Sequence, residues 1–152
     1  MSKIIISDTS CLIALDRIGH IGLLQKVFTT VYTTQIVVEE FERPLPDWIL
    51  VKDVININRL EQLKLVLDPG EASAISLALE TKNPVLIIDE KKGRKIAQEL
   101  NITIIGTLKV LLIAKNKGVI VSVKQLIDEL KKHSFRFNKA VLDEVLRLAG
   151  ED

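Results

Sequence analysis

Short apolar runs alternate along this chain with longer stretches in which apolar residues recur every three or four positions. The short runs predict β-strands at residues 3–7, 30–33, 50–55, 85–88 and 102–105. The periodic stretches predict helices at about 11–27, 35–43, 58–67, 70–81, 91–100, 107–117, 122–132 and 138–149. Strands that are apolar throughout and alternate with helices indicate an α/β fold. We therefore expect a three-layer α/β/α sandwich with a mostly parallel sheet of four or five strands.

Several boundaries between these elements have recognisable local signals. The Asp-Pro-Gly-Glu sequence at 68–71 predicts a helix start, with an N-cap, a proline at the first helical position and an acid at N3. Ser122 and Gln125 have the spacing of a capping box. No repeat or linker interrupts the chain, so we expect residues 1–152 to form one domain with a C-terminal helical hairpin at about 122–150. The apolar stripes of this hairpin could pack on the domain's own flank or on a second subunit.

Composition and charge exclude several classes of protein. Apolar residues make up 47% of the chain and aromatic residues only 4%, which excludes disorder and predicts an aliphatic core. The net charge of +1 excludes a general attraction to nucleic acid, so an anionic ligand would need a local basic patch. Cys11 is the only cysteine, which excludes an internal disulfide and a cysteine-based zinc cluster. No apolar stretch approaches the ~18 residues of a membrane span and no signal-peptide pattern precedes the first strand, so we expect a cytoplasmic protein without membrane contact.

Acidic residues follow two of the predicted strands at the point where each strand ends. Asp8 comes directly after the first strand, and Asp89 and Glu90 come after the strand at 85–88. The carboxyl ends of parallel strands lie on one edge of the sheet, where ligands bind. Carboxylates gathered there repel one another unless a cation neutralises them. Asp8, Asp89 and Glu90 are therefore candidate ligands of a divalent metal ion.

Two further acids are expected near the same edge. Glu40 lies in the helix after the second strand, and helical spacing places it, rather than Glu39, on the inward side with Ile36. Glu71 opens a helix rich in small residues, which can lie close to its neighbours. Mg²⁺ prefers oxygen ligands and usually takes only one or two carboxylates directly, and a bound ion can orient an attacking water for phosphodiester cleavage. The candidate catalytic residues are Asp8, Glu40, Glu71, Asp89 and Glu90.

These residues also have purely structural interpretations. Asp8 and Asp89 could cap the helices that follow them, because aspartate is a favoured N-cap residue. Glu71 occupies the N3 position, where a capping box favours glutamate, although that role is compatible with a catalytic one. Ser10 could support the site by donating a hydrogen bond to Asp8 or to a ligand, or it could simply begin the first helix.

Basic residues follow the second acidic pair at once. Lys91, Lys92 and Arg94 stand at the start of a helix, where cations oppose the helix dipole. Beside an acidic edge they suit attraction of a phosphate backbone, although such a run is often only a solvated face. The segment 131–139 interleaves cations and aromatics, so it could stack single-stranded bases, or its phenylalanines could anchor the turn between the terminal helices.

Six segments of the chain share their order and spacing with one known family. These segments are 6–10, 37–40, 70–75, 86–94, 104–108 and 114–120. Together they resemble a PIN domain, and more closely the small prokaryotic PIN proteins of the DUF3368 type, over about residues 3–150. The resemblance implies a ribonuclease that depends on Mg²⁺ or Mn²⁺ and often serves as the toxin of a type II toxin–antitoxin pair. RNA would be the substrate, and an antitoxin protein would be a partner.

The resemblance also implies roles for particular residues. The acidic positions of the family fall on Asp8, Glu40 and the Asp89-Glu90 pair, with Glu71 typical of this branch. The third acidic position often reads Asp-Asp in the branch, so which member of the pair faces the metal stays open. Gly106-Thr107 stands after the last strand, where many relatives carry a further Asp or Asn.

The leading hypothesis from the sequence is therefore a metal-dependent endoribonuclease that cleaves phosphodiester bonds, with Lys91, Lys92 and Arg94 holding the RNA backbone. One alternative is a PIN-fold module that binds RNA or a partner without cleaving. Another is a phosphoacceptor receiver domain, which is also doubly wound and carries a lysine such as Lys109 after its last strand, although Asp8 lacks the paired acid that it needs. We also expect a homodimer, because the hairpin's apolar stripes exceed what a five-stranded sheet needs to cover and symmetric dimers are the commonest oligomers.

Overall fold

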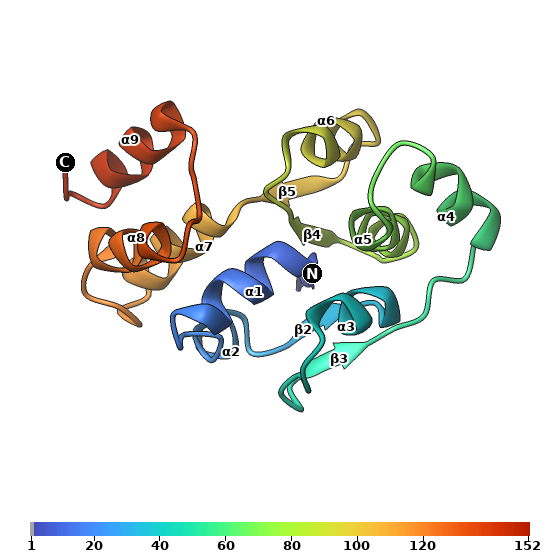
Figure 1. Cartoon of the computed structure of the whole chain (residues 1–152), viewed down its shortest axis with the longest axis horizontal. Helices are drawn as coiled ribbons and strands as arrows, with labels where there is room; N and C mark the ends of the chain where they lie inside the picture. Colours follow the sequence, from blue (N-terminus) through green and yellow to red (C-terminus); the bar gives the residue numbers. More distant parts are fainter. Residues whose placement is uncertain (1) are drawn as a thin grey trace.

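A five-stranded parallel sheet lies at the centre of the computed structural model, which describes residues 2–152 (Figure 1). Its strands are β1 (Ile4–Ser7), β2 (Val31–Thr33), β3 (Ile49–Val51), β4 (Pro84–Ile87) and β5 (Thr103–Ile105). Their order across the sheet is β3-β2-β1-β4-β5, and every neighbouring pair is parallel. A receiver domain has the order 2-1-3-4-5, so this topology excludes the receiver alternative.

Helices cover both faces of the sheet, which confirms the predicted sandwich. The helices are α1 (Thr9–Arg17), α2 (Leu23–Phe28), α3 (Gln35–Phe41), α4 (Ile57–Lys64), α5 (Pro69–Leu79), α6 (Lys91–Glu99), α7 (Thr107–Asn116), α8 (Val123–Lys132) and α9 (Lys139–Leu148). Side chains alternate along each strand: Ile5 and Ile87 join one core, and Ile6 and Leu86 join the other. Strands β1 and β4 are apolar except at Ser7, because both of their faces are buried.

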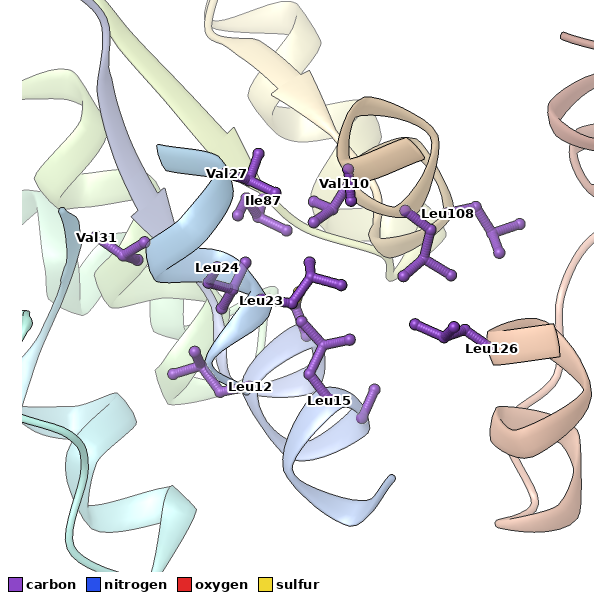
Figure 2. Close-up of a cluster of buried hydrophobic side chains, with 14 of the residues drawn as sticks. Leu12, Leu15, Leu23, Leu24, Val27, Val31, Ile87, Leu108, Val110 and Leu126 are labelled. Atoms are coloured by element: carbon purple, nitrogen blue, oxygen red, sulfur yellow. The ribbon is translucent and has the colours of Figure 1, made fainter. Parts of the chain in front are cut away.

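The first core lies between the sheet and helices α1, α2, α7 and α8. Figure 2 shows Leu12 and Leu15 of α1 beside Leu23 and Leu24 of α2, with Leu126 of α8 on the far side. Cys11 is also buried in this core, as expected of a small hydrophobic side chain. The second core lies under α4, α5 and α6.

The single helix predicted at 11–27 is wrong, because the structure has two helices separated by a turn at Gly19. The φ angle of Gly19 is 74°, and its N–H donates to the carbonyl of Asp16 at 3.0 Å. The N–H of His20 donates to the carbonyl of Leu15 at 2.7 Å. These two bonds form a Schellman motif, which ends a helix at a glycine in the left-handed region.

The remaining boundaries lie close to the predictions. The expected strand at 50–55 is shorter, because the N–H groups of Ile55 and Asn56 donate to the carboxylate of Glu80 instead of to a neighbouring strand. Asp68 caps α5 by accepting from the N–H of Glu71 at 2.9 Å, which confirms the predicted helix start.

The C-terminal hairpin packs on its own domain. Val123, Leu126, Ile127 and Leu130 of α8 are buried in the first core, and both α8 and α9 contact α7. The carboxylate of Glu151 accepts hydrogen bonds from the N-terminus of α8 and from a lysine of α7, which fastens the end of the chain to this flank. Within residues 2–152 no helix is both long enough and apolar enough to cross a membrane.

Candidate active site

The first acidic residue of the site leaves the sheet at its carboxyl edge. Strands β1 and β4 pair with Ser7 opposite Ile87, and the N–H of Asp8 donates to the carbonyl of Ile87 at 3.1 Å. Asp8 and Asp89 therefore emerge from neighbouring strands at the same edge, as predicted. They differ in environment, because Asp8 is 3% exposed whereas Asp89 is exposed.

Asp8 does not act as a helix cap. It occupies the N-cap position of α1, but its side chain makes no capping hydrogen bond. Burial raises the pKa of Asp8 to about 7, and the negative charges of Asp68, Glu40 and Asp89 push the pKa in the same direction. Ser10 lies within 3.5 Å of the Asp8 carboxylate, at the limit of a hydrogen bond. The chain thus keeps a carboxyl group where its charged form is unfavourable.

Glu40 reaches the same edge from α3, and it is the inward member of the Glu39-Glu40 pair, as predicted. Its Oε1 accepts from the hydroxyl of Thr9 at 2.5 Å, and its Oε2 accepts from the N–H of Gly70 at 3.0 Å. Glu39 is exposed. Glu40 therefore ties the start of α1 to the start of α5, and its side chain is fixed on both oxygens.

Glu71 is a second buried acid, 4% exposed, on the first turn of α5. Burial, a side-chain hydrogen bond with Asp68, and the charges of Asp68, Asp8 and Glu90 together raise the pKa of Glu71 to about 8. Its Oε2 is buried and has no hydrogen-bond partner among the described residues. A role in helix capping accounts for the hydrogen bond from the backbone N–H of Glu71 to Asp68. It does not account for the buried Oε2 of the Glu71 side chain.

Asp89 is held in place by the first residue of α7. The N–H of Thr107 donates to its Oδ1 at 2.8 Å, and the hydroxyl of Thr107 donates to its Oδ2 at 2.6 Å. The alternative interpretation of Asp89 as the cap of the next helix does not hold, because Glu90 stands at the N-cap of α6 and makes no side-chain capping bond there. The charge of Asp89 acts on Asp8, and that of Glu90 acts on Glu71.

Three glycines make room for three of these acids. A Cβ atom at Gly70 would lie 2.0 Å from Oε1 of Glu40. At Gly93 it would lie 2.9 Å from Oε2 of Glu71, and at Gly106 it would lie 2.9 Å from Oδ1 of Asp89. Any larger residue would displace the carboxylate beside it. The Gly106-Thr107 sequence after the last strand therefore serves Asp89 directly.

The basic residues flank this edge. Lys91 and Lys92 are exposed on the first turn of α6, and Arg94 is half-buried one turn further on. The Nη1 of Arg94 donates to the carbonyl of Ile88 at 2.7 Å, so one side of the guanidinium is fixed, and within residues 2–152 Arg94 forms no salt bridge.

Sequence reasoning missed three residues of the site. Thr9 and Thr107 hold Glu40 and Asp89 across 31 and 18 residues of sequence, and no local pattern signals such contacts. Asp68 was interpreted only as a helix cap, but its charge also raises the pKa of Asp8. Its position could have been inferred, because a helix that begins at the carboxyl edge of a sheet brings its cap there too.

A family model described as a PIN domain, DUF3368, matches residues 4–151. The chain belongs to this family. A PIN domain is a nuclease-type fold, and the parallel sheet with acids at its carboxyl edge agrees with that assignment. A search of curated proteins found no match to the chain.

The carboxylate oxygens of the site are suitable donors for a hard divalent cation, although they do not form a complete set of metal ligands. Within residues 2–152 no three His, Cys, Asp or Glu side chains are grouped so as to hold a metal ion, and the metal-ligand role expected of Asp8, Asp89 and Glu90 stays a prediction. The unpaired Oε2 of Glu71 and the buried carboxyl of Asp8 are oxygen donors whose charge a cation would neutralise. Mg²⁺ usually takes only one or two carboxylates directly and keeps several waters, which this pair can satisfy.

Proposed function

We propose that this PIN domain is an endoribonuclease that depends on Mg²⁺ or Mn²⁺. The observation that carries the proposal is the pair of buried carboxyls, Asp8 and Glu71, at the carboxyl edge of the sheet. No lysine, arginine or histidine of residues 2–152 forms a salt bridge with either of them. Buried acids without a cationic partner are costly, and they persist mainly where function requires them.

The residues divide into groups with distinct tasks. Asp8 and Glu71 would hold the ion directly. A bound ion would supply polarisation of the scissile phosphate and a lower pKa for the attacking water. Asp89 and Glu90 would accept hydrogen bonds from that water and from the ion's other waters, with Asp89 already oriented by Thr107.

Glu40 has a different task, because its two oxygens accept hydrogen bonds from the first turns of two different helices, α1 and α5. It would position Asp8 and Glu71 by joining the helices that carry them. Lys91, Lys92 and Arg94 would hold the phosphate backbone without reading the bases.

The deciding experiment measures cleavage of a labelled RNA with Mg²⁺, with Mn²⁺ and with a chelator. The variants Asp8→Asn and Glu71→Gln should each lose at least about a hundredfold in cleavage rate, because each removes a direct ligand. The matched control is Glu99→Gln, which changes an exposed acid at the end of α6. Cleavage that persists in chelator, or that survives both site substitutions, would overturn the proposal.

A PIN-fold module that binds RNA without cleaving it remains the alternative function. The same assay separates the two functions, because such a module would retain RNA at every metal concentration and release no product.

The antitoxin partner and the homodimer both stay predictions. The hairpin stripe of α8 that suggested a dimer is buried within the chain, and within the hairpin's two helices the exposed large apolar residues are Val141 and Leu148 of α9. The antitoxin rests on the family resemblance alone.

A further inference from the structure

Two consecutive threonines at the end of β2 form hydrogen bonds with the elements that carry the two buried acids. Thr33 is the last residue of β2, Thr34 is the N-cap of α3, and both are buried. The hydroxyl of Thr33 bonds to β1, and that of Thr34 bonds to α5. Asp8 follows β1 directly, and Glu71 lies in the first turn of α5.

Thr33 holds the peptide group that precedes Asp8. Strands β1 and β2 align Ile6 with Tyr32. One residue further on, the hydroxyl of Thr33 donates to the carbonyl of Ser7 at 2.8 Å. Since that carbonyl belongs to the planar peptide group between Ser7 and Asp8, the hydrogen bond fixes the point at which Asp8 leaves the sheet.

Thr34 holds the corresponding peptide group before Glu71, and it does so through Ser73. The hydroxyl oxygens of Thr34 and Ser73 lie 2.7 Å apart, and Ser73 donates to the carbonyl of Gly70 at 2.8 Å. A hydroxyl has one hydrogen, so Thr34 is the donor in the bond between the two side chains. The oxygen of Thr34 accepts from the N–H of Val37 at 3.2 Å. This hydroxyl relay therefore runs in one direction, from Thr34 through Ser73 to the peptide group that leads into Glu71.

The hydroxyl relay gives α3 a second attachment to α5. Figure 1 shows the two helices side by side, and they contact each other. Near the end of α3, Glu40 accepts from the N–H of Gly70. At the start of α3, Thr34 donates to Ser73. One attachment would allow α3 to pivot on α5, whereas two attachments about 9 Å apart along α3 fix the direction of the helix. The relay therefore fixes Glu40 and Glu71 relative to each other.

We propose that Thr33 and Thr34 are positioning residues, which place Asp8 and Glu71 for a metal ion before it binds. The proposal rests on the proposed function, in which these two acids hold the ion. Removing a group that orients a metal ligand commonly lowers metal affinity by about 10- to 100-fold. Helix capping uses only the oxygen of Thr34, so the hydrogen bond that its hydroxyl donates to Ser73 has a separate role.

Three variants each remove one hydroxyl. Thr33→Val and Thr34→Val replace it by a methyl group of similar size. Ser73→Ala breaks the relay while the cap of α3 stays intact, and it should fold because alanine is the best helix former. Thr34→Ser is the conservative variant, because it keeps the hydroxyl. The matched control is Asn56→Ala, which removes the N-cap of α4 and leaves the relay untouched.

Calorimetric titration with Mn²⁺ at one pH measures the effect on the metal site. Each of the three variants should lower Mn²⁺ affinity by about tenfold, and Thr34→Ser should bind Mn²⁺ as the wild type does. Thr34→Val combined with Ser73→Ala should bind no more weakly than either single variant, because both break the same relay.

The control separates positioning from a general loss of stability. Asn56→Ala should unfold at a lower urea concentration and keep the Mn²⁺ affinity of the wild type. Wild-type Mn²⁺ affinity in the three variants would overturn the proposal. So would an equal loss of affinity in Asn56→Ala, because any destabilising change would then have the same effect.

Hydrogen exchange in chelator separates this proposal from the ribonuclease proposal, because it needs neither metal nor RNA. Thr34→Val and Ser73→Ala should speed exchange of the amide N–H groups of Gly70 and Glu71 by about tenfold, since each variant removes a hydrogen bond that holds this turn. Asn56→Ala should leave these two amides unchanged. If the wild type binds no Mn²⁺, the ribonuclease proposal fails, while faster exchange still supports the positioning role. Unchanged exchange in both variants overturns the positioning role even if RNA cleavage is metal-dependent.

Discussion

The substitution Asp8→Asn should stabilise the metal-free protein, and by an amount that depends on pH. The folded pKa of Asp8 is about 7, against an ordinary value of 3.8. An acid whose pKa is raised on folding destabilises the native state above that pKa, and the penalty falls as pH drops towards the unfolded value. At 1.36 kcal/mol per pKa unit, the penalty is about 4 kcal/mol at pH 8.5 and about 1.5 kcal/mol at pH 5.

Urea unfolding in chelator at these two pH values measures the effect. The asparagine amide has its own cost of burial, but that cost is the same at both pH values. The diagnostic quantity is therefore the difference between the two stabilisation energies, which should be about 2 to 3 kcal/mol. The control is Asp53→Asn, which changes an exposed aspartate in the loop after β3 and should give no such difference.

A stabilisation that is equal at pH 5 and pH 8.5 would refute the reasoning, because it would show that burial does not penalise the charged form of Asp8. A destabilisation that is equal at both pH values would also show that burial does not penalise the charged form of Asp8. It would indicate that the Asp8 carboxylate has a structural role.

Two further substitutions test how the carboxylates are held. Thr107→Val removes the hydroxyl that donates to Asp89, so cleavage should fall by about tenfold, with a stability loss of only about 1 kcal/mol in urea unfolding. Unchanged cleavage would show that the orientation of Asp89 is unimportant. Gly93→Ala would place a Cβ atom 2.7 Å from Ile88 and 2.9 Å from Glu71, so it should cost about 1–3 kcal/mol and reduce the rise in melting temperature on adding Mg²⁺. A variant as stable as the wild type would show that Glu71 can move aside.

The fold was predictable because two of the inner strands, β1 and β4, carry apolar residues on both faces. Ile4 to Ile6 and Val85 to Ile88 leave no polar position that could face water, and such runs occur where helices cover both faces of a parallel sheet. The error at α1 and α2 has a specific cause. Apolar periodicity continues through the turn, so the pattern alone does not reveal the break, and Gly19 was the residue that signalled it.

The acids of the site were predictable to different degrees. The positions of Asp8 and Asp89 at one edge of the sheet can be predicted from the direction of the strands alone. The inward orientation of Glu40 can be predicted from helical spacing. The partners that fix them could not be found in this way. Thr107 contacts Asp89 only because β5 lies beside β4 and starts α7 at the same edge, which is a consequence of the completed sheet.

Metal binding and stability should be linked in this protein through the same two side chains. Asp8 and Glu71 are unfavourable as charged groups in the metal-free fold, and their raised pKa values measure that cost. A cation must displace protons from them, so its affinity should rise with pH up to about 8. The stabilisation gained on binding, RT ln(1 + [L]/Kd), should rise over the same range in which the metal-free fold loses stability. The carboxylates that weaken the metal-free fold above neutral pH are thus the groups that we expect to bind a divalent ion.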